Sequence, residues 1–206
     1  MNVFLLTQPD AFYIPKLLDR FMAEKPDGAH VIGAAVLQGE IAASNVGDYV
    51  RLLGPRGVLV NGFEFARYKL LDLVDQATGL KGLYSVHGAL RAHGIPEHTP
   101  DTINDASFLN RLRDWNVDLV ISIACPQIVR SDLLSLPPKG VINIHGALLP
   151  RYRGKLPSFW VLANGETTTG VTVHYMNEAL DDGPIIVQNE VPIAPDDTLH
   201  SLVLKS

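Results

Sequence analysis

The sequence contains a single cysteine, Cys125, among its 206 residues. One cysteine cannot form a disulfide within the chain, which is typical of proteins that stay in a reducing compartment. No apolar run reaches the roughly 20 residues that a membrane-spanning helix requires. The N-terminal stretch is too short and too poor in positive charge for a secretory signal. We therefore expect a cytoplasmic protein that does not enter a membrane.

The chain also lacks an excess of positive charge. It has 17 Lys and Arg residues against 22 Asp and Glu residues, a formal net charge of −5. Nucleic-acid-binding domains usually carry the opposite balance, so a nucleic acid is not the expected partner. Internal repeats and low-complexity tracts are missing as well. A chain of this length can bury the core of one domain, and we expect residues 1–206 to form one.

The histidines do not follow the spacing of a zinc site. His87, His93 and His98 lie five or six residues apart, and Cys125 has no second cysteine to act with. We therefore expect no metal. No histidine adjoins Cys125 in the sequence, so we interpret it as a small buried residue at the end of a strand and not as a nucleophile.

Most of the chain alternates between strand and helix patterns. Short apolar runs bounded by Pro or Gly indicate buried strands at residues 2–7, 30–37, 118–124 and 141–145. Helices are expected at residues 11–24, 85–93, 104–115, 131–136 and 157–163. Strands separated by helices indicate a parallel sheet, so the predicted fold is a doubly wound α/β domain.

The last third of the chain differs. Residues 169–176 alternate between apolar and polar, and residues 185–193 form a second strand pattern only a loop away, which predicts an antiparallel extension at the edge of the sheet. A capped helix begins after Thr198 and stops after barely two turns. We expect that the C-terminus cuts this helix and that a C-terminal part is missing.

Residues 42–76 mix basic and apolar side chains. The Gly and Pro residues at positions 54–57 predict two helices joined by a turn. Such a stretch is typical either of a helix that binds a membrane surface or a partner, or of a helical layer on the sheet with solvated charges. The acidic balance of the chain favours the second interpretation.

Candidate chemistry lies where strands end, because ligands of open α/β sheets bind at the carboxyl ends of the strands. Asn143 and His145 are two residues apart and share one face of a strand, so a hydrogen-bond donor and a titratable base would face one ligand. Asp181 and Asp182 precede Gly183. The pattern alone also allows plain structural or turn roles for all four residues.

Three segments decide between these roles: Asn-Ile-His-Gly-Ala-Leu-Leu-Pro-Arg-Tyr-Arg-Gly at 143–154, Thr-Gly-Val-Thr-Val-His at 169–174 and Leu-Asp-Asp-Gly-Pro-Ile-Ile at 180–186. In this order they resemble the formyltransferases that use 10-formyltetrahydrofolate. The resemblance runs from about residue 118 to residue 200 and implies a Rossmann-like core. A paired motif is far more specific than one short match.

The resemblance implies a role for particular residues. Asn143, His145 and Asp181 match the catalytic triplet, with Asp181 preferred to Asp182 because it directly follows Leu180. The donor 10-formyltetrahydrofolate would be the one cofactor. The residues matching the walls of its pterin pocket are Pro126, Gln127, Ile128, Val129, Met176, Asn177 and Leu180. His145 could act either as a base or as a charged stabiliser of the oxyanion.

The chain departs from the family in three places. Gly146 and Ala147 replace a common Pro-Ser, and Asp182 stands where Thr or Ala is common. Glycinamide ribonucleotide transformylases hold the substrate phosphate in a Gly/Ser-rich loop after the first strand. Here residues 7–10 contain no glycine and include Asp10, which argues against that substrate.

Three functions follow from the resemblance. The preferred one is formyl transfer to a primary amine of a small molecule, such as an amino-sugar nucleotide or a biosynthetic intermediate, with Arg151 and Arg153 binding the acceptor. The second is the catalytic part of a methionyl-tRNA formyltransferase, in which these arginines would face tRNA. The third is a non-catalytic folate-binding module, which should lack a member of the triplet. The oligomeric state stays open.

Overall fold

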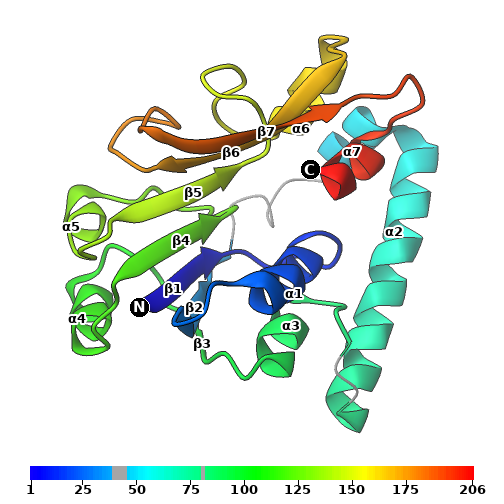
Figure 1. Cartoon of the computed structure of the whole chain (residues 1–206). Helices are drawn as coiled ribbons and strands as arrows, with labels where there is room; N and C mark the ends of the chain where they lie inside the picture. Colours follow the sequence, from blue (N-terminus) through cyan, green and yellow to red (C-terminus); the bar gives the residue numbers. More distant parts are fainter. Residues whose placement is uncertain (39–45, 80–81) are drawn as a thin grey trace.

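The computed structural model describes residues 1–38, 46–79 and 82–206 (Figure 1). Its strands are β1 (Asn2–Thr7), β2 (His30–Val36), β3 (Glu97–His98), β4 (Leu119–Ile123), β5 (Val141–His145), β6 (Thr168–Tyr175) and β7 (Ile185–Pro192). They form one seven-stranded sheet in the order β3-β2-β1-β4-β5-β6-β7. Strands β2 and β3 are added in turn on one side of β1, and β4 then lies on the other side of β1. This reversal is the kind of switch point beside which α/β domains bind ligands.

The sheet combines two kinds of pairing. Strands β1 to β5 pair in parallel, whereas β6 is antiparallel to both β5 and β7. The predicted doubly wound α/β fold with an antiparallel edge near the C-terminus is therefore confirmed. Because β6 runs back along β5, residues near the end of β5 lie opposite residues of β6.

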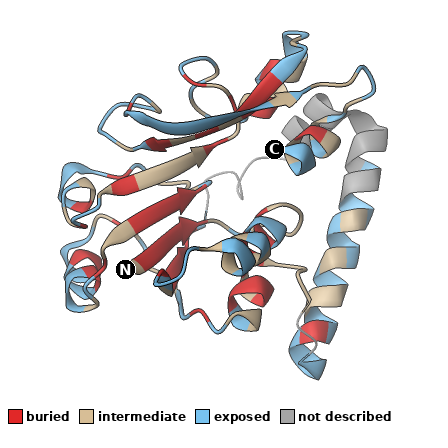
Figure 2. Cartoon of the chain, in the orientation of Figure 1, coloured by how far each residue is buried: buried red, intermediate tan, exposed pale blue. Residues whose placement is uncertain are grey.

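The helices of the described residues are α1 (Ile14–Glu24), α2 (Val46–Thr78), α3 (Val86–Ala92), α4 (Ala106–Asp114), α5 (Ser131–Leu134), α6 (Pro157–Ala163) and α7 (Leu199–Lys205). Of these, α1, α3, α4 and α5 cover the two faces of the parallel part. Val3 and Leu5 of β1 pack with α1 and α3, while Phe4 and Leu6 pack with α4 and α5. This alternation puts a core on each face of the sheet, and Figure 2 shows the buried residues concentrated in β1 and β4.

Helix α1 begins later than its apolar pattern predicts. The carboxylate of Asp10 accepts hydrogen bonds from the backbone N–H groups of Phe12, Tyr13 and Ile14 at 2.8, 2.6 and 3.0 Å. These N–H groups belong to the entry of the helix and would otherwise have no partner within it. Asp10 therefore keeps residues 11–13 in a turn, and the helix starts at Ile14.

The interpretation of residues 42–76 is wrong in two respects. Residues 46–78 form one helix of 33 residues and not two, while residues 42–45 lie outside the described residues. In a helix interior, a Gly costs about 1 kcal/mol and a Pro about 3 kcal/mol relative to Ala. The other residues of a long helix can offset these costs. The helix also does not lie on the sheet as a layer: it stands beside α1 and α3 (Figure 1), with Leu59 and Phe63 74% and 70% exposed.

The C-terminal helix follows its predicted cap. Thr198 accepts a hydrogen bond from the backbone N–H of Ser201, whose side chain in turn accepts one from the N–H of Thr198. This reciprocal arrangement satisfies two N–H groups at the start of α7. In the parts of the chain that the structure describes, no helix combines the length and apolarity needed to cross a membrane.

Candidate functional site

The candidate site begins at the end of β5. Asn143 and His145 belong to this strand, where antiparallel pairing sets Asn143 opposite His174 and His145 opposite Thr172 of β6. His145 is only 5% exposed. The prediction that Asn143 and His145 share one face is confirmed by their common approach to a single carboxylate, that of Asp181.

Asp181 reaches this face from the loop between β6 and β7. Its Oδ2 lies 3.5 Å from Nδ1 of His145, and its Oδ1 lies 3.5 Å from Nδ2 of Asn143. The backbone N–H of Gly154 donates to Oδ2 at 2.8 Å. The structure thus brings together residues that are 38 positions apart in the sequence.

The loop that carries Asp181 depends on an unusual backbone. Asp181 has a φ of 46°, in the left-handed region that residues with a Cβ rarely adopt. Gly183 packs so closely on β6 that a Cβ there would lie 1.8 Å from the carbonyl oxygen of Tyr175. Only glycine fits at that point, so the close approach of this loop to β6 helps to hold Asp181 in place.

The partners of His145 define its tautomer. Its Nε2 lies 2.8 Å from the backbone carbonyl oxygen of Tyr152, which can only accept, so Nε2 carries a hydrogen and donates. Its Nδ1 faces Asp181. An imidazolium would donate to both acceptors, and loss of its Nδ1 proton would leave a base pointing at the carboxylate.

His174 is a site residue that the sequence reasoning missed. It is 1% exposed, and its Nε2 lies 3.3 Å from Nδ2 of Asn143 and 3.6 Å from Oδ1 of Asp181. Its Nδ1 donates to the carbonyl oxygen of Tyr175 at 2.8 Å, which leaves Nε2 to accept from Asn143 and so to orient its amide. The Thr-Val-His alternation of residues 172–174 indicated a strand. Only the register of β6 against β5 shows that His174 lies opposite Asn143.

The residues predicted to line the folate pocket separate into two groups. Val129 is 2% exposed and belongs to the core beneath α4 and α5, and the side chain of Gln127 bonds to the backbone of residues 101 and 103. Ile128 and Leu180 instead present exposed apolar side chains, 78% and 67% exposed.

The other predicted pocket residues are less prominent. Pro126 and Met176 are partly buried, and Met176 packs against the core. Asn177 is exposed, and its side-chain oxygen accepts a hydrogen bond from the N–H of Ala179 at 3.0 Å.

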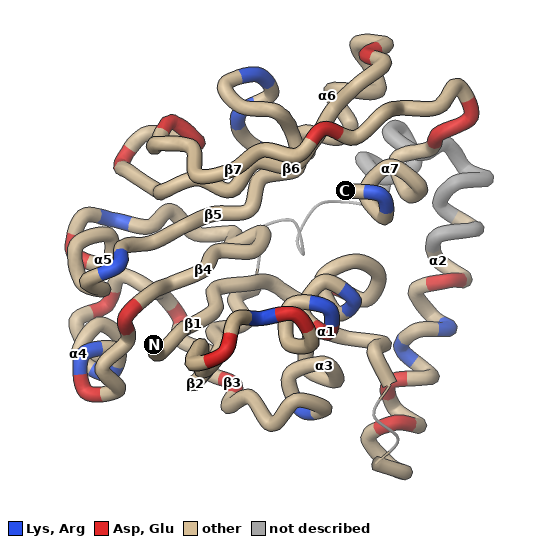
Figure 3. The backbone as a smooth tube through the Cα atoms, viewed as in Figure 1, with Lys and Arg blue, Asp and Glu red and all other residues tan. Residues whose placement is uncertain are grey.

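Both arginines predicted to bind the acceptor are paired with carboxylates of the same chain. Arg151 pairs with Glu166, and Arg153 pairs with Asp182. Figure 3 shows Lys and Arg residues interspersed with acidic residues over the described helices and loops. A phosphate that approaches Arg151 or Arg153 would therefore meet a cation that already has an anionic partner.

Other titratable candidates lie in separate surroundings. Burial raises the pKa of the Cys125 thiol to about 11, so the thiol stays protonated at neutral pH. His87 and His93 each pair with a carboxylate, that of Glu97 and that of Asp19, at 2.8 Å.

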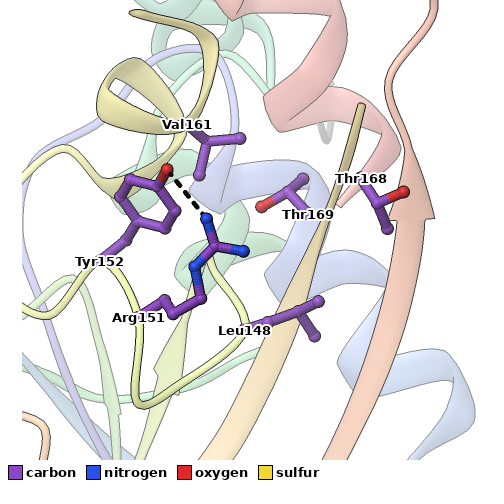
Figure 4. Close-up of a pocket in the computed structure, with 6 residues that line it drawn as sticks. All are labelled: Leu148, Arg151, Tyr152, Val161, Thr168 and Thr169. Atoms are coloured by element: carbon purple, nitrogen blue, oxygen red, sulfur yellow. Dashed lines mark hydrogen bonds between the residues drawn. The ribbon is translucent and has the colours of Figure 1, made fainter. Parts of the chain in front are cut away.

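Two hollows near this end of the sheet do not hold the triplet. A cavity of about 10 Å³ lies between the 148–152 turn and β6 (Figure 4), lined by Leu148, Arg151, Tyr152, Val161, Thr168 and Thr169. Its volume suits about one water molecule. An open groove of about 390 Å³ is lined by Leu162, residues 165–167, residues 193–195 and Asp197. Asn143, His145 and Asp181 line neither of them.

Comparisons with known proteins find relatives in sequence and in structure. The chain is 46% identical over 114 residues to a methionyl-tRNA formyltransferase of Trichlorobacter lovleyi, an alignment that covers 55% of the chain and 36% of that relative. The chain thus matches about a third of the length of this curated relative.

Solved structures show the same fold. A phosphoribosylglycinamide formyltransferase from Anaplasma phagocytophilum matches with a TM-score of 0.66 at 21% identity, covering 100% of this chain and 78% of that one. A sugar N-formyltransferase from a Shewanella species matches with a TM-score of 0.54 at 22% identity, covering 99% of this chain and 63% of that one.

The family described as formyl transferase matches residues 74–205, well over half of the chain. This stretch contains β4 to β7 and every member of the triplet. Members of this family are folate-dependent one-carbon transferases. The chain belongs to the formyl transferase family.

Proposed function

We propose that the chain transfers the formyl group of 10-formyltetrahydrofolate to a primary amine of a small molecule. The observation that carries this proposal is the convergence of Asn143, His145 and Asp181 within hydrogen-bond or ion-pair reach of one another. These are a neutral donor, a titratable ring and a carboxylate, which are the groups that acyl transfer between nitrogen atoms requires.

The reaction balances without a further reactant. The amine nitrogen forms a bond to the formyl carbon, and the bond from that carbon to N10 of the folate breaks. The amine loses one proton and N10 gains one. The barrier comes from the negative charge that develops on the formyl oxygen and from the proton that must leave the attacking nitrogen.

The three side chains can stabilise the oxyanion and accept the proton. The Nδ2–H of Asn143 can donate to the developing oxyanion, and one such donor is typically worth roughly 3–4 kcal/mol. His145 can take the amine proton on Nδ1 or donate to the oxyanion as an imidazolium. Asp181 lies 3.5 Å from that nitrogen and can accept a hydrogen bond from it while the nitrogen carries the proton.

The surroundings of the triplet suit a flat, partly apolar donor. Leu180 directly precedes Asp181, and Ile128 follows β4, the neighbour of β5 in the sheet; both side chains are largely exposed. Exposed apolar side chains next to polar catalytic groups are typical of ligand sites. These residues would hold the folate ring while the triplet faces its formyl group.

The acceptor side favours a small amine without a phosphate at the start of α1. Asp10 already accepts hydrogen bonds from three backbone N–H groups there, which are the groups that would otherwise bind an anion. A glycinamide ribonucleotide is therefore disfavoured. A sugar nucleotide whose phosphates bind elsewhere stays compatible with this loop.

One observation favours a second candidate, formylation of methionyl-tRNA. The relative from Trichlorobacter lovleyi carries that name and shares 46% identity over 114 residues. Against it stand the net charge of −5 and the pairing of Arg151 and Arg153 with carboxylates. Because tRNA binding depends on unpaired cations and on salt, a gel shift that weakens steeply with salt would favour this candidate.

The proposal is tested first by calorimetry on the full chain with a hydrolysis-stable 10-formyl folate analogue. Saturable binding at one site is expected. Formyl transfer from 10-formyltetrahydrofolate is then measured to a panel of amino-sugar nucleotides, small primary amines and methionyl-tRNA, with His145→Ala as the inactive variant.

Each outcome decides a different part of the proposal. Transfer to a small amine that is lost in His145→Ala supports it. Transfer to methionyl-tRNA alone would replace the preferred acceptor with the second candidate. A folded chain that neither binds the analogue nor transfers a formyl group would refute the proposal.

A further inference from the structure

The carbonyl that orients His145 belongs to a residue in a costly conformation. The backbone oxygen of Tyr152 lies 2.8 Å from Nε2 of His145, and Tyr152 has a φ of 58°. Residues with a Cβ rarely adopt this left-handed region, and they persist there only when surrounding contacts impose it. The contacts that hold Tyr152 therefore also determine where its carbonyl oxygen points.

The side chain of Tyr152 is held by Glu166, which lies between α6 and β6. The phenol hydroxyl donates to Oε1 of Glu166 at 2.6 Å, and Arg151 pairs with the same oxygen while its guanidinium lies 5.2 Å from the centre of the Tyr152 ring. The hydrogen bond from Tyr152 and the nearby Arg151 lower the pKa of Glu166, which keeps the carboxylate charged.

Glu166 is itself anchored in the scaffold. Its backbone N–H donates to the carbonyl oxygen of Val161 in α6 at 3.2 Å, and β6 begins two residues after it. The side chains of Arg151 and Tyr152 also line a hollow of about 10 Å³ that reaches α6 and the start of β6 (Figure 4). The phenol thus bonds to a carboxylate whose backbone is held by α6.

We propose that Tyr152 and Glu166 are positioning residues for His145. The bond between the Tyr152 hydroxyl and the Glu166 carboxylate holds the backbone of Tyr152 so that its carbonyl accepts the Nε2–H of His145. The imidazole then presents Nδ1 to Asp181 and to the reacting groups. This inference deepens the proposed function and rests on it.

The two ends of the turn are held by residues other than Glu166. Before Tyr152, the N–H of Leu149 donates to Oγ1 of Thr172 at 3.1 Å; after it, the N–H of Gly154 donates to Asp181 at 2.8 Å. Both ends of the turn therefore stay attached when Glu166 is changed. Loss of its carboxylate should release the middle of the turn and the ring of His145, and leave the fold in place.

The test compares Glu166→Ala, Glu166→Gln and Tyr152→Phe in the full chain. Alanine removes the acceptor of the phenol hydrogen bond, glutamine keeps an acceptor oxygen, and phenylalanine removes only the hydroxyl. Glu24→Gln is the matched control, because Glu24 pairs with Arg20 at 3.0 Å on the exposed surface of α1. Melting temperature and far-ultraviolet circular dichroism establish that each variant is folded.

Two readouts separate positioning from simple support of the fold. The first is kcat against KM for the formyl donor. The second is the 15N–1H spectrum of the histidine side chains, with the His145 signals assigned from the His145→Asn variant. The wild-type chain should show His145 with a hydrogen on Nε2.

We expect Glu166→Ala and Tyr152→Phe to lower kcat at least about tenfold with KM for the donor nearly unchanged, because a misplaced catalytic group slows the step without weakening binding. The Nε2–H signal of His145 should broaden or give way to a mixture of tautomers. Glu166→Gln should recover most of both, and Glu24→Gln should match the wild type.

Folded Glu166→Ala and Tyr152→Phe variants that keep the wild-type kcat and the Nε2–H signal would overturn the inference. A wild-type chain that transfers no formyl group would refute the proposed function, and the histidine spectra would still decide whether Glu166 and Tyr152 orient His145.

Discussion

The corner of the molecule that holds the proposed catalytic triplet, here called the catalytic corner, and helix α2 are built in opposite ways. The catalytic corner comprises the end of β5, residues 148–156, residues 177–183 and the facing His174 of β6, and polar side chains from these separate segments bond to one another. His145 and His174 there are 5% and 1% exposed. In α2 the leucines at positions 70 and 73 face outward, 62% and 61% exposed.

Helix α2 contacts the body through polar and aromatic side chains. Asp72 accepts a hydrogen bond from the hydroxyl of Ser85 at 2.7 Å, and Asp75 pairs with Arg91 at 2.8 Å. Both contacts join α2 to α3 and its N-terminal cap, and the ring of Tyr68 packs edge-on against Phe12 and Tyr84. Leu70 and Leu73 of α2 stay exposed.

This contrast indicates which residues should affect the proposed formyl transfer. In the catalytic corner Asn143, His145 and Asp181 each contact another segment, so a change at one of them disturbs the others. The outward side chains of α2 have few such partners among the described residues, so changes there should leave the reaction centre intact. The predictions below test this contrast.

The largest effect is expected at Asp181. Asp181→Asn should lower turnover at least about a hundredfold and leave folate affinity nearly unchanged, because the amide cannot stabilise the charged ring of His145. Its neighbour Asp182 provides a matched control, since Asp182 is exposed and pairs with Arg153. Steady-state kinetics that show equal losses in Asp181→Asn and Asp182→Asn would contradict the assignment.

Thiol labelling compares the end of β4, the neighbour of β5 in the sheet, with helix α2. Burial raises the pKa of Cys125 to about 11, so at pH 8 its reactive thiolate should be about a hundredfold scarcer than that of an ordinary thiol. Iodoacetamide should therefore label Cys125 slowly and a cysteine introduced by Leu70→Cys quickly, as followed by mass spectrometry. The folded state holds the Cys125 proton more tightly, so this residue's contribution to stability falls as the pH rises from about 9 to 11.

A labelling rate at Cys125 equal to that of the introduced cysteine at pH 8 would show that the end of β4 is open to solvent. The same experiment in Cys125→Ser with Leu70→Cys identifies the signal of each site.

An intermediate effect is expected at Thr172, which joins the catalytic corner to β6. Its buried hydroxyl donates to the carbonyl of Ala147 at 2.6 Å and accepts from the N–H of Leu149 at 3.1 Å. Thr172→Val leaves both buried backbone groups without this partner and should lower the free energy of unfolding by about 1–3 kcal/mol in urea denaturation. Thr168→Val, an exposed position in the same strand, should change it little.

The smallest effect is expected on the outer side of α2. Leu70→Gln and Leu73→Gln replace exposed leucines by good helix formers, so the free energy of unfolding should stay within about 0.5 kcal/mol of the wild type. Formyl transfer should also be unchanged. A loss of more than about 2 kcal/mol in the same urea titration would mean that this side of α2 is covered in solution.

Much of the fold followed from local pattern. Strands β1 and β5 and helix α6 have the predicted bounds, and the alternation of β6 and the short loop to β7 indicated the antiparallel edge. These features depend on apolar periodicity and on Pro or Gly at the boundaries, which act over a few residues. Helix α2 was misread because the local cost of Gly and Pro was taken as decisive.

Part of the site was also readable. Asn143 and His145 share a face because they are two apart in a strand, and the resemblance added Asp181 from a distant loop. His174, Tyr152 and Glu166 were not identified as site residues, because their roles depend on the register of β6 against β5 and on one turn of the backbone. Neither feature has a signature in the local sequence.

Composition and short periodic patterns in the sequence indicated the alternating fold and the acidic balance, because they reflect which residues are buried in strands and helices. The family resemblance of three segments pointed to the three side chains of the proposed chemistry. The contacts among those side chains depend on the tertiary structure. The register of β6 sets His174 against Asn143, and the left-handed turn at Tyr152 aims a carbonyl at His145. Contacts between segments far apart in the chain depend on packing, which no local stretch of sequence specifies.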